Sequence, residues 1–391
     1  MPILLDVLKP SVVTKIVSRI RTPRNVLSRR WGMQIGGPAV DQFTMPNINQ
    51  YTYDIFDSVR TIARFRNPNV AAGTIAPNPV GNNTVTFARV HEKLPMDYGT
   101  IAGIRTIGEN AGSMDRVGKR YVEKQAKYMR ERQENAREFM IGSLFRGGLY
   151  YLHQSGDDLY PSYTSTSALL TVDLKFDTQH KLIAGSFAAG LAMNTGTNTI
   201  TATWATASTD IPLQLQAVSA GFEREVGEPL TNIDCNYTVW NNVVQNDKVR
   251  QLAGTANTSF EMWKLEDDKG EDGTRTGVQQ ARIKGLDWLT WTIYSGGLDV
   301  YDGSTETFTK LIPDDYALFY IEHDQSPTGW IKMVEGTEII KENDWSPPRE
   351  VTGFEAWIME KSDPARFDMF TLCKPTLELN VPKAIAIARV Q

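Results

Sequence analysis

The strongest periodic pattern in the sequence lies between Ser113 and Arg146. Apolar residues recur there near helical spacing, no proline interrupts them, Ser113 is a suitable N-cap, and Gly147-Gly148 mark the end. At about 1.5 Å per residue, a helix over this span is roughly 50 Å long, longer than most helices of globular domains. Its apolar stripe consists of Met114, Val117, Tyr121, Tyr128, Ala136, Phe139 and Leu144.

The other faces of this predicted helix are crowded with charged residues. They include the i,i+4 pairs Glu123/Lys127 and Arg130/Glu134, which stabilise an exposed helix modestly. The pattern predicts a long strut with only a narrow apolar stripe, and a solvated coiled-coil seam is the alternative.

A turn-rich stretch precedes this helix, from Phe65 to Met96. Several prolines and glycines and the pair Asn82-Asn83 lead into the alternating run Thr84–Val90, which is typical of a strand in a two-stranded ribbon. The stretch predicts a long hairpin. Because an isolated hairpin is marginally stable in water, it has to lie either on a partner subunit or on its own domain.

The rest of the chain predicts a mixture of helices and strands. Between Asp210 and Gly227 the sequence predicts an amphipathic helix, with Ile211, Leu215, Val218, Phe222 and Val226 on one face. A second helix is expected from about Thr238 to Gly254, with Val239, Val243 and Leu252 facing the core. After a charged, glycine-rich loop at Glu266–Gly273, strand patterns begin with Trp288–Tyr294 and Leu298–Tyr301.

Composition and charge limit the classes of protein to which the chain can belong. The chain has 391 residues, 41% of them hydrophobic, and a net charge of −5, which argues against a surface that coats nucleic acid throughout. The first 50 residues are nevertheless basic and predict an extended arm that faces nucleic acid or an acidic neighbouring subunit; a surface helix at Ser11–Ile20 with a linker is the alternative. The basic residues of the arm are Lys9, Lys15, Arg19, Arg21, Arg24, Arg29 and Arg30.

We find no pattern that supports catalysis, a cofactor or a metal site. The only cysteines, Cys235 and Cys373, are too far apart for a CxxC motif, and the four histidines match no HxxxH or HExxH spacing. Phosphate-binding loops and the GxSxG motif are absent, and the acidic loop at 266–273 does not match an EF-hand. The apolar runs are too short to span a bilayer. We therefore assign no catalytic, cofactor-binding or metal-binding residue and expect neither an enzyme nor a membrane protein.

A resemblance to a known family emerges in the C-terminal tract. The segments Trp291-Thr292-Ile293-Tyr294-Ser295-Gly296 and Leu311-Ile312-Pro313-Asp314-Asp315 are followed by Ser362–Met369, which contains Asp363-Pro364-Ala365-Arg366. Together with the closing strands Pro375–Asn380 and Ala384–Val390, this order resembles the coat-protein family typified by the E protein of phage lambda. Upstream, the hairpin resembles the extended loop of that family, and the long helix resembles its spine helix.

The resemblance implies an α+β fold of the Hong Kong 97 type. Residues 1–50 would form an N-terminal arm and 51–110 the extended-loop region. The peripheral domain, with its spine helix and β-sheet, would comprise 111–165 and 320–375, and the apical domain 166–319 and 376–391. It also implies that the hairpin and the under-packed helix lie on other subunits.

The function implied is that of a major capsid protein, which assembles into hexamers and pentamers of an icosahedral phage head around double-stranded DNA. Such a protein resides in the virion, assembles in the host bacterial cytoplasm, and has as partners itself, a portal, a scaffold or protease, a decoration protein and DNA bound non-specifically on the inner face. An encapsulin-type nanocompartment shell and an unfamiliar α/β enzyme are the alternatives. The candidate intersubunit contacts are Arg64, Arg66, Phe87, Arg89, His91, Lys93, Glu123, Lys127, Arg130 and Arg132.

Overall fold

The structure is a computed structural model in which the chain forms two compact units. Unit 1 comprises Met1–Tyr51, Val85–Ile141 and Lys332–Glu378, and unit 2 comprises Thr52–Thr84, Gly142–Ile331 and Leu379–Gln391. The residues that the structure describes are 25–46, 49–55, 81–97, 111–153, 159–163, 168–174, 200, 202–254, 263–269, 275–301, 305–321, 330–341, 347–362 and 365–391.

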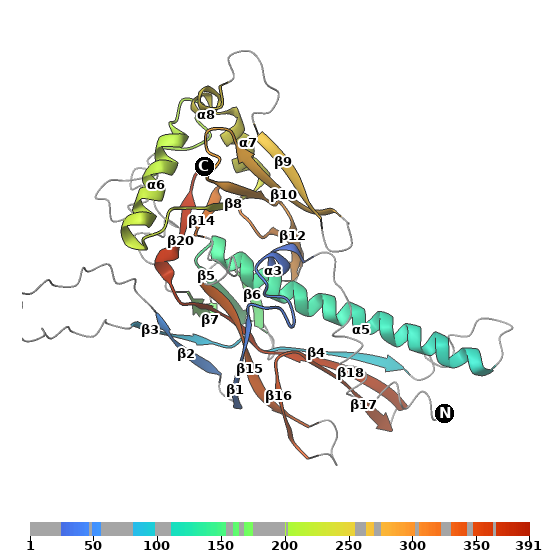
Figure 1. Cartoon of the computed structure of the whole chain (residues 1–391). Coiled ribbons are helices and arrows are strands. Elements are labelled where there is room, and N and C mark those ends of the chain that lie inside the picture. The colour runs from blue at the N-terminus through green and yellow to red at the C-terminus, as the bar shows by residue number, and fades with distance from the viewer. Residues whose placement is uncertain are drawn as a thin grey trace, which may run out of the picture. The chain divides into compact units, whose positions relative to one another are not determined.

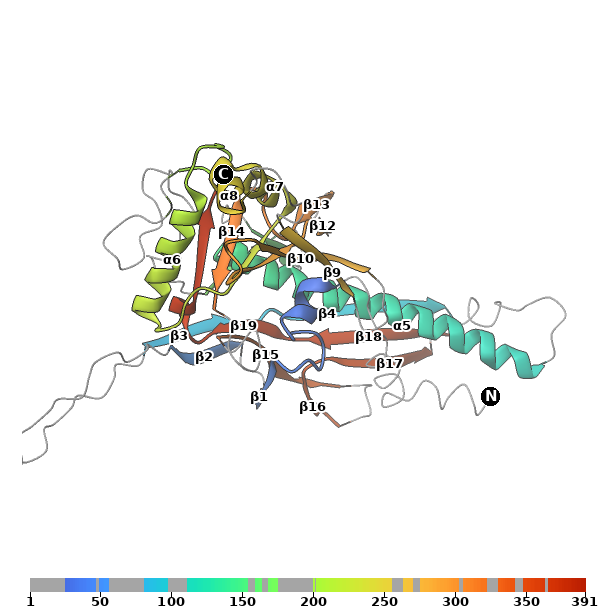
Figure 2. The ribbon, with the colours of Figure 1, turned by 45° about the horizontal axis from the view of Figure 1, so that its top comes forward.

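The long helix is confirmed as α5, Ala111–Gly142, and a 3₁₀ turn at Ser143–Phe145 follows it. Gly147, with φ of 73°, adopts the left-handed conformation that ends helices, as the Gly-Gly pair predicts. In both views, α5 lies along a three-stranded antiparallel sheet (Figures 1 and 2). Its strands, in order, are β17 (Glu355–Ser362), β18 (Ala365–Cys373) and β4 (Val90–Asp97).

The predicted apolar stripe of the long helix is confirmed at Tyr121, Phe139 and Leu144 but not at Tyr128. Val122, Ala126 and Met129 pack against the sheet, whereas Tyr128 is 49% exposed. Adjacent residues of a helix point about 100° apart, so Tyr128 cannot share the face of Met129. The prediction for Tyr128 was wrong, because two polar residues, Gln133 and Arg137, continue the buried face that the apolar pattern alone could not trace.

A second sheet of unit 1 is built from segments far apart in the sequence. Strand β1 (Val40–Pro46) pairs in parallel with β15 (Ile331–Ile340), which also pairs with β16 (Arg349–Thr352) and β19 (Pro375–Leu379). Ahead of β1, the short helix α3 (Val26–Arg30) and the following loop bury Leu27, Trp31 and Met33. Within the predicted arm, the chain is therefore packed from Asn25 on, and residues 1–24 lie outside the described residues.

Before α5, a ribbon pairs β2 (Gln50–Ile55) with β3 (Gly81–Thr86). Strand β2 lies ahead of the hairpin predicted at 65–96, and residues 56–80 lie outside the described residues. The alternating run Thr84–Val90 is not one strand, because β3 ends at Thr86 and β4 begins at Val90 in a different sheet. Between them, the backbone N–H of Phe87 donates to the Asn49 carbonyl and its ring is buried, so the chain leaves the ribbon there.

Unit 2 is organised around a six-stranded sheet of mixed direction. Helix α6 (Ile211–Glu225) lies beside β20 and β14 in both views (Figures 1 and 2). The side chain of Asp210 accepts a hydrogen bond from the Leu213 N–H at 3.1 Å, and Gly227 has φ of 100°, so both predicted ends are confirmed. The strands, in spatial order, are β20 (Ile385–Arg389), β14 (Tyr316–Tyr320), β8 (Asn232–Cys235), β11 (Thr290–Ile293), β10 (Arg275–Ile283) and β9 (Trp263–Lys269).

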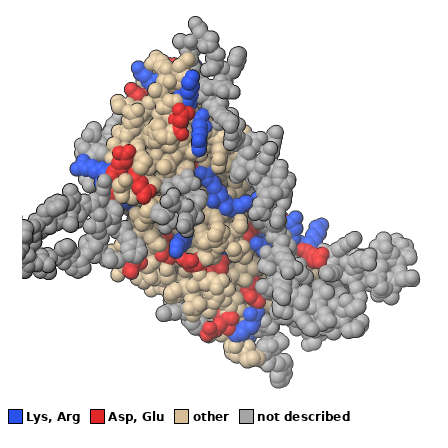
Figure 3. Space-filling model, in the orientation of Figure 1, with Lys and Arg blue, Asp and Glu red and all other residues tan. Residues whose placement is uncertain are grey.

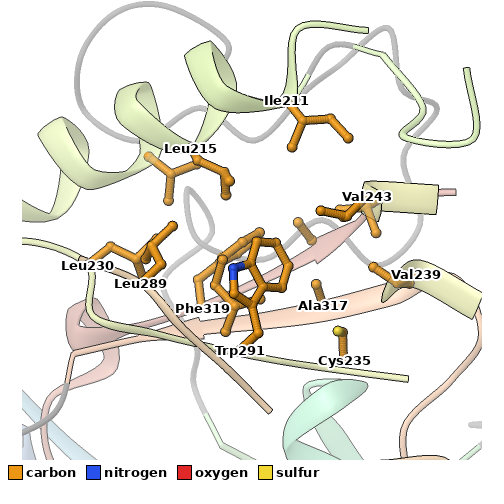
Figure 4. Close-up of a cluster of buried hydrophobic side chains, with 14 of the residues drawn as sticks. Ile211, Leu215, Leu230, Cys235, Val239, Val243, Leu289, Trp291, Ala317 and Phe319 are labelled. Carbon is orange, nitrogen blue, oxygen red and sulfur yellow. The ribbon is translucent and has the colours of Figure 1, made fainter. Parts of the chain in front are cut away.

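The core of unit 2 lies between this sheet and its helices. Figure 4 shows Trp291 of β11 among Ile211 and Leu215 of α6 and Val239 and Val243 of α7. Trp291 is fully buried, and the four helical residues are those that the sequence pattern placed on the core faces. Periodicity therefore identified this core correctly.

The second predicted helix of unit 2 is in fact two helices, α7 (Tyr237–Gln245) and α8 (Asp247–Leu252). Asn246 between them has extended backbone angles and caps α8, which rotates the following residues. Val249 is therefore buried and Leu252 is 43% exposed, contrary to the prediction. The predicted acidic loop is also shorter than expected, because residues 266–269 belong to β9 and pair with β10.

Two small sheets complete unit 2. One has the order β6 (Leu159–Ser162), β5 (Gly148–His153) and β7 (Ala168–Asp173). The other is an antiparallel ribbon of β12 (Gly297–Tyr301) and β13 (Glu306–Lys310), and β12 contains the predicted strand Leu298–Tyr301. A short 3₁₀ turn at Pro382–Ala384 precedes β20.

Candidate assembly surface

Several of the candidate contact residues lie on or beside α5, whose buried face is unusually polar. The carboxylate of Glu138 in α5 is buried and accepts hydrogen bonds from the backbone N–H groups of Val26, Leu27 and Ser28 at 3.1, 2.7 and 2.7 Å. These are N–H groups at the start of α3, which have no partner within their own helix. Burial raises the pKa of Glu138 to about 7, against the opposing effect of the three N–H groups.

Three more buried charges of α5 extend this network. Glu134 accepts a hydrogen bond from the Ile35 N–H at 3.2 Å and pairs with Arg130 at 3.3 Å. Arg137, fully buried, pairs with Glu335 of β15 and donates to the Met33 carbonyl at 3.5 Å. The Arg130/Glu134 pair predicted from spacing is confirmed, but it lies inside unit 1.

The C-terminal half of α5 is therefore packed by its own chain. The segment 25–39 and β15 cover the face that the sequence assigned to solvent or to other subunits. The expectation of an under-packed strut was wrong for this half. Nothing in the helical pattern marked the charges at 130, 134, 137 and 138 as buried. The available signal was the apolar residues Trp31, Met33 and Ile35, which need a surface to pack on.

The exposed part of α5 carries an aromatic residue among charges. The Arg132 guanidinium donates to Glu92 of β4 at 2.5 and 2.7 Å and lies 5.8 Å from the centre of the Tyr128 ring. The hydrogen bonds with Glu92 raise the pKa of Arg132 further. Lys127 lies beside Glu131 at 3.9 Å. We call residues 127, 128, 131 and 132 the spine surface; Glu123 is half-buried one turn before it. Tyr128 and Glu131 are the members that were not among the candidates from the sequence.

A second exposed surface lies on the far face of the β17–β18–β4 sheet. Side chains alternate along a strand, and Leu94 and Met96 point to α5, so His91 and Lys93 point away. The His91 ring stacks on Trp357 and Phe370, each with centroids 5.8 Å apart, and burial, together with nearby Arg89, lowers its pKa. We call the exposed residues His91 and Lys93 the outer sheet face; Trp357, 3% exposed, is buried in a cluster with Ile340, Val351 and Leu372.

The remaining candidates are spread over other environments. Arg89 is exposed and pairs with Glu338 at 2.6 Å. Phe87 is buried against Phe43, with ring centroids 6.1 Å apart, within unit 1. Arg64 and Arg66 lie outside the described residues. The structure thus divides the candidates between two exposed surfaces and an interior, and does not bring them together in one patch.

The described residues contain no cluster of three His, Cys, Asp or Glu side chains placed to hold a metal ion. None of the described helices combines the length and the apolar character needed to cross a bilayer. Figure 3 shows basic and acidic side chains in small groups of both signs, without a broad field of either on the face in view.

Comparison with known proteins gives structural matches only. No protein family and no curated protein matches the sequence. The structure is similar to a prophage protein of E. coli CFT073 described as a capsid protein, with 14% identity, 98% of this chain and 99% of that chain covered, and a TM-score of 0.53. Two further structures are less similar. One is a phage-related protein of Bordetella bronchiseptica RB50, with 9% identity, 98% of this chain and 97% of that chain covered, and a TM-score of 0.49. The other is the capsid of Ralstonia phage GP4, with 11% identity, 95% and 93% of the two chains covered, and a TM-score of 0.43.

At these identities the likeness concerns the fold, and it extends over nearly the whole of both chains. The specific resemblance to the E protein of phage lambda stays a prediction. One unit has a long helix on an antiparallel sheet, and the other has a mixed sheet covered by helices. This architecture agrees with the fold expected from the sequence. The chain therefore has the α+β fold of phage capsid proteins, of the Hong Kong 97 type.

Proposed function

We propose that the chain is the major capsid protein of a tailed phage, which self-assembles into hexamers and pentamers of an icosahedral head around double-stranded DNA. The observation that carries this proposal is the capsid-protein fold, matched over 98% of the chain by a prophage protein described as a capsid protein. The role is structural, and we assign no residue to catalysis.

The distribution of surface groups supports an assembly role. The spine surface joins an exposed tyrosine and an arginine, two residue types enriched among those that dominate protein interfaces. The outer sheet face adds an exposed histidine, His91, that stacks on the buried ring of Trp357 and the partly buried ring of Phe370. Single exposed aromatic residues are normal on a monomer, so exposure alone does not indicate an interface. The support comes from the location of both surfaces on one unit of a capsid-type fold.

We assign the parts of the fold accordingly. Unit 1 contains 111–141 and 332–375 of the proposed peripheral domain, and unit 2 contains 166–319 and 379–391 of the proposed apical domain. Residues 142–165 and 320–331, which the sequence assigned to the peripheral domain, belong to unit 2. Residues 1–50 and 51–110 remain the proposed arm and extended-loop region. The ribbon β2–β3 forms the base of that loop. In this arrangement, Arg89, His91, Lys93, Lys127 and Arg132 are the exposed candidates for contacts with neighbouring subunits.

The proposed partners follow from this role. They are other copies of the chain, a portal, a scaffold or protease, and in some heads a decoration protein. DNA is contacted non-specifically on the inner face through local basic groups, since the net charge of −5 does not favour general nucleic-acid binding. The protein acts in the virion after assembly in the host cytoplasm.

Electron microscopy of the purified protein tests the proposal directly. We expect round, uniform shells in the micrographs. The same protein should sediment rapidly in a gradient. A protein that stays strictly monomeric under all assembly conditions contradicts the proposal. Shells that consistently enclose a copurifying enzyme, without portal or DNA, assign the chain to the encapsulin type instead.

A further inference from the structure

The ribbon β12–β13 presents an exposed aromatic and acidic face. Asp299 pairs with Phe308 and Tyr301 with Glu306 in its register, so these four side chains share one face. Phe308 is 59% exposed and Tyr301 45%, and both carboxylates are exposed. We call these four residues the ribbon face. The Tyr301 ring packs edge-on against Tyr160 of β6, with centroids 5.4 Å apart, so Phe308 and the two carboxylates form the part of this face offered to a partner.

The position of the ribbon is fixed at its base. Arg146 donates to the carbonyls of Lys310 and Leu311 at 2.8 and 2.7 Å, and its guanidinium lies 3.9 Å from the centre of the Tyr163 ring. The Phe308 ring lies over Gly297, where an added Cβ would be 2.6 Å from the ring. The aromatic face is therefore held in place before any partner arrives, which lowers the entropic cost of binding.

A complementary patch lies elsewhere on unit 2. Lys248 and Leu252 are one helical turn apart on α8, and Leu252 packs against Gly285 in the turn between β10 and β11. Lys284 and Trp288 of that turn are exposed, Trp288 to 40%. We call residues 248, 252, 284 and 288 the α8 tip. It combines two apolar side chains with two lysines; in the same turn, Asp287 accepts a hydrogen bond from the Gly285 N–H.

The two patches lie at opposite ends of one strand. The turn that carries Lys284 and Trp288 leads into β11 at Thr290, and the ribbon starts at Gly297 after β11 ends at Ile293. Both views place α8 apart from β12 (Figures 1 and 2). Two different, complementary patches on separate sides of a subunit form a head-to-tail contact, and such contacts close into rings.

We propose that the ribbon face of one copy docks on the α8 tip of the next copy within a capsomer. This inference rests on the proposed function and specifies one contact of it. Phe308 and Trp288 are the apolar anchors, since large aromatic residues carry most of the energy of interfaces. The pairing of Asp299 and Glu306 with Lys248 and Lys284 selects the partner and its orientation.

Charge reversal on both sides tests the contact. The variant Asp299→Lys/Glu306→Lys and the variant Lys248→Glu/Lys284→Glu are each expected to lower the yield of shells at least tenfold in a gradient and by electron microscopy. Combining all four substitutions in one chain is expected to restore shells. Thr307→Lys is the matched control, because Thr307 lies on the opposite face of the same strand, and shells should persist.

The outcomes separate this inference from the proposed function. If both reversed variants form shells at the wild-type yield, or if the combined variant stays unassembled while each reversed variant fails, the two patches do not bind each other. Wild-type shells in the same experiment then leave the proposed function standing. If the wild type forms no shells, the proposed function fails and this contact with it. Thermal unfolding of each variant verifies that the subunit is folded.

Discussion

At the scale of single residues, Glu138 shows how the interior of unit 1 departs from a simple hydrophobic core. Its buried carboxylate holds the first turn of α3 through three backbone N–H groups. Removing one partner of such a network leaves the others buried without hydrogen bonds, which costs more than the bond itself contributes. The first turn of α3, within the predicted arm, is therefore anchored by this side chain of the spine helix, and Glu134 and Arg137 hold the loop that follows.

The raised pKa of Glu138 predicts a pH dependence of stability. Because its pKa rises from 4.5 in the unfolded chain to about 7 in the folded one, the folded state binds the extra proton between these values. The free energy of unfolding should therefore fall by about 3 kcal/mol from this group as pH rises from about 4.5 to 7, at 1.36 kcal/mol for each pKa unit. Urea unfolding of the unassembled subunit at several pH values measures this slope.

Glu138→Gln is the control for this prediction, since glutamine does not titrate and should lack that part of the slope. It should also be less stable at low pH, because the amide nitrogen cannot accept the Ser28 N–H. An unfolding free energy of the wild type that rises over the same pH range, with the slope removed by Glu138→Gln, would contradict the raised pKa.

Two residues of α6 provide a matched test of the core. Phe222 is fully buried, while Leu213 on the same helix is 61% exposed. Phe222→Ala should lower the free energy of unfolding by about 3–5 kcal/mol through lost burial and a cavity, and Phe222→Asp should prevent folding. Leu213→Asp should change it by less than about 0.5 kcal/mol, as is usual at exposed positions. Chemical denaturation compares them, and equal effects would refute the assigned helix face.

At the scale of elements, Asn246 decides how α7 and α8 are arranged. Its side-chain oxygen accepts hydrogen bonds from Lys248 and Val249 at 3.0 and 3.1 Å, and its nitrogen donates to the Thr209 carbonyl at 2.9 Å. The sequence pattern read the region as one helix because the apolar spacing continues across the break. The cap breaks the helix, buries Val249 and turns Leu252 outward.

Asn246→Ala should therefore destabilise unit 2 by about 2 kcal/mol, since it removes an N-cap and leaves a buried carbonyl without its donor. The neighbouring exposed residue provides the control, and Gln245→Ala should have almost no effect. Thermal unfolding of the unassembled subunit measures both. A loss for Asn246→Ala no larger than for Gln245→Ala would show that the cap does not hold this junction.

At the scale of the whole molecule, the β2–β3 ribbon offers a clean way to test the proposed extended loop. Ile55 and Gly81 are neighbours, since an added Cβ on Gly81 would lie 3.6 Å from the Cβ of Ile55. A short Asn-Gly turn can therefore replace residues 56–80 while both strands remain. A deletion that extends to Val90 would also remove β3 and the buried Phe87, and would confuse misfolding with lost assembly.

We expect this variant to keep the unfolding temperature of the unassembled subunit and to lose shells. Gradient sedimentation and electron microscopy measure assembly, and circular dichroism measures the fold. The control retains residues 56–80 and carries a two-residue Gly-Ser insertion in the connection between β2 and β3. It shows whether altering this connection by itself affects assembly. Particles of wild-type size from the shortened chain would exclude an essential role for this loop.

The sequence by itself determined the elements whose stabilisation is local. Helical periodicity and end signals located α5 and α6, because the spacing of apolar residues and the capping groups act within a few residues of one another. The strand patterns at Trp288–Tyr294 and Leu298–Tyr301 likewise predicted β11 and β12. The order of short segments in the C-terminal tract pointed to the fold that the structural comparison supports.

The tertiary structure alone decided which polar faces are buried. Arg137 and Glu138 read as solvent-exposed in a helical pattern, and their partners lie about 200 and 110 residues away in the chain. It also decided that Leu252 and Tyr128 face outward. A charged side chain is stable in the interior of this protein only when another segment supplies its hydrogen bonds. Here that segment is distant in the sequence, so the local spacing of residues could not predict it.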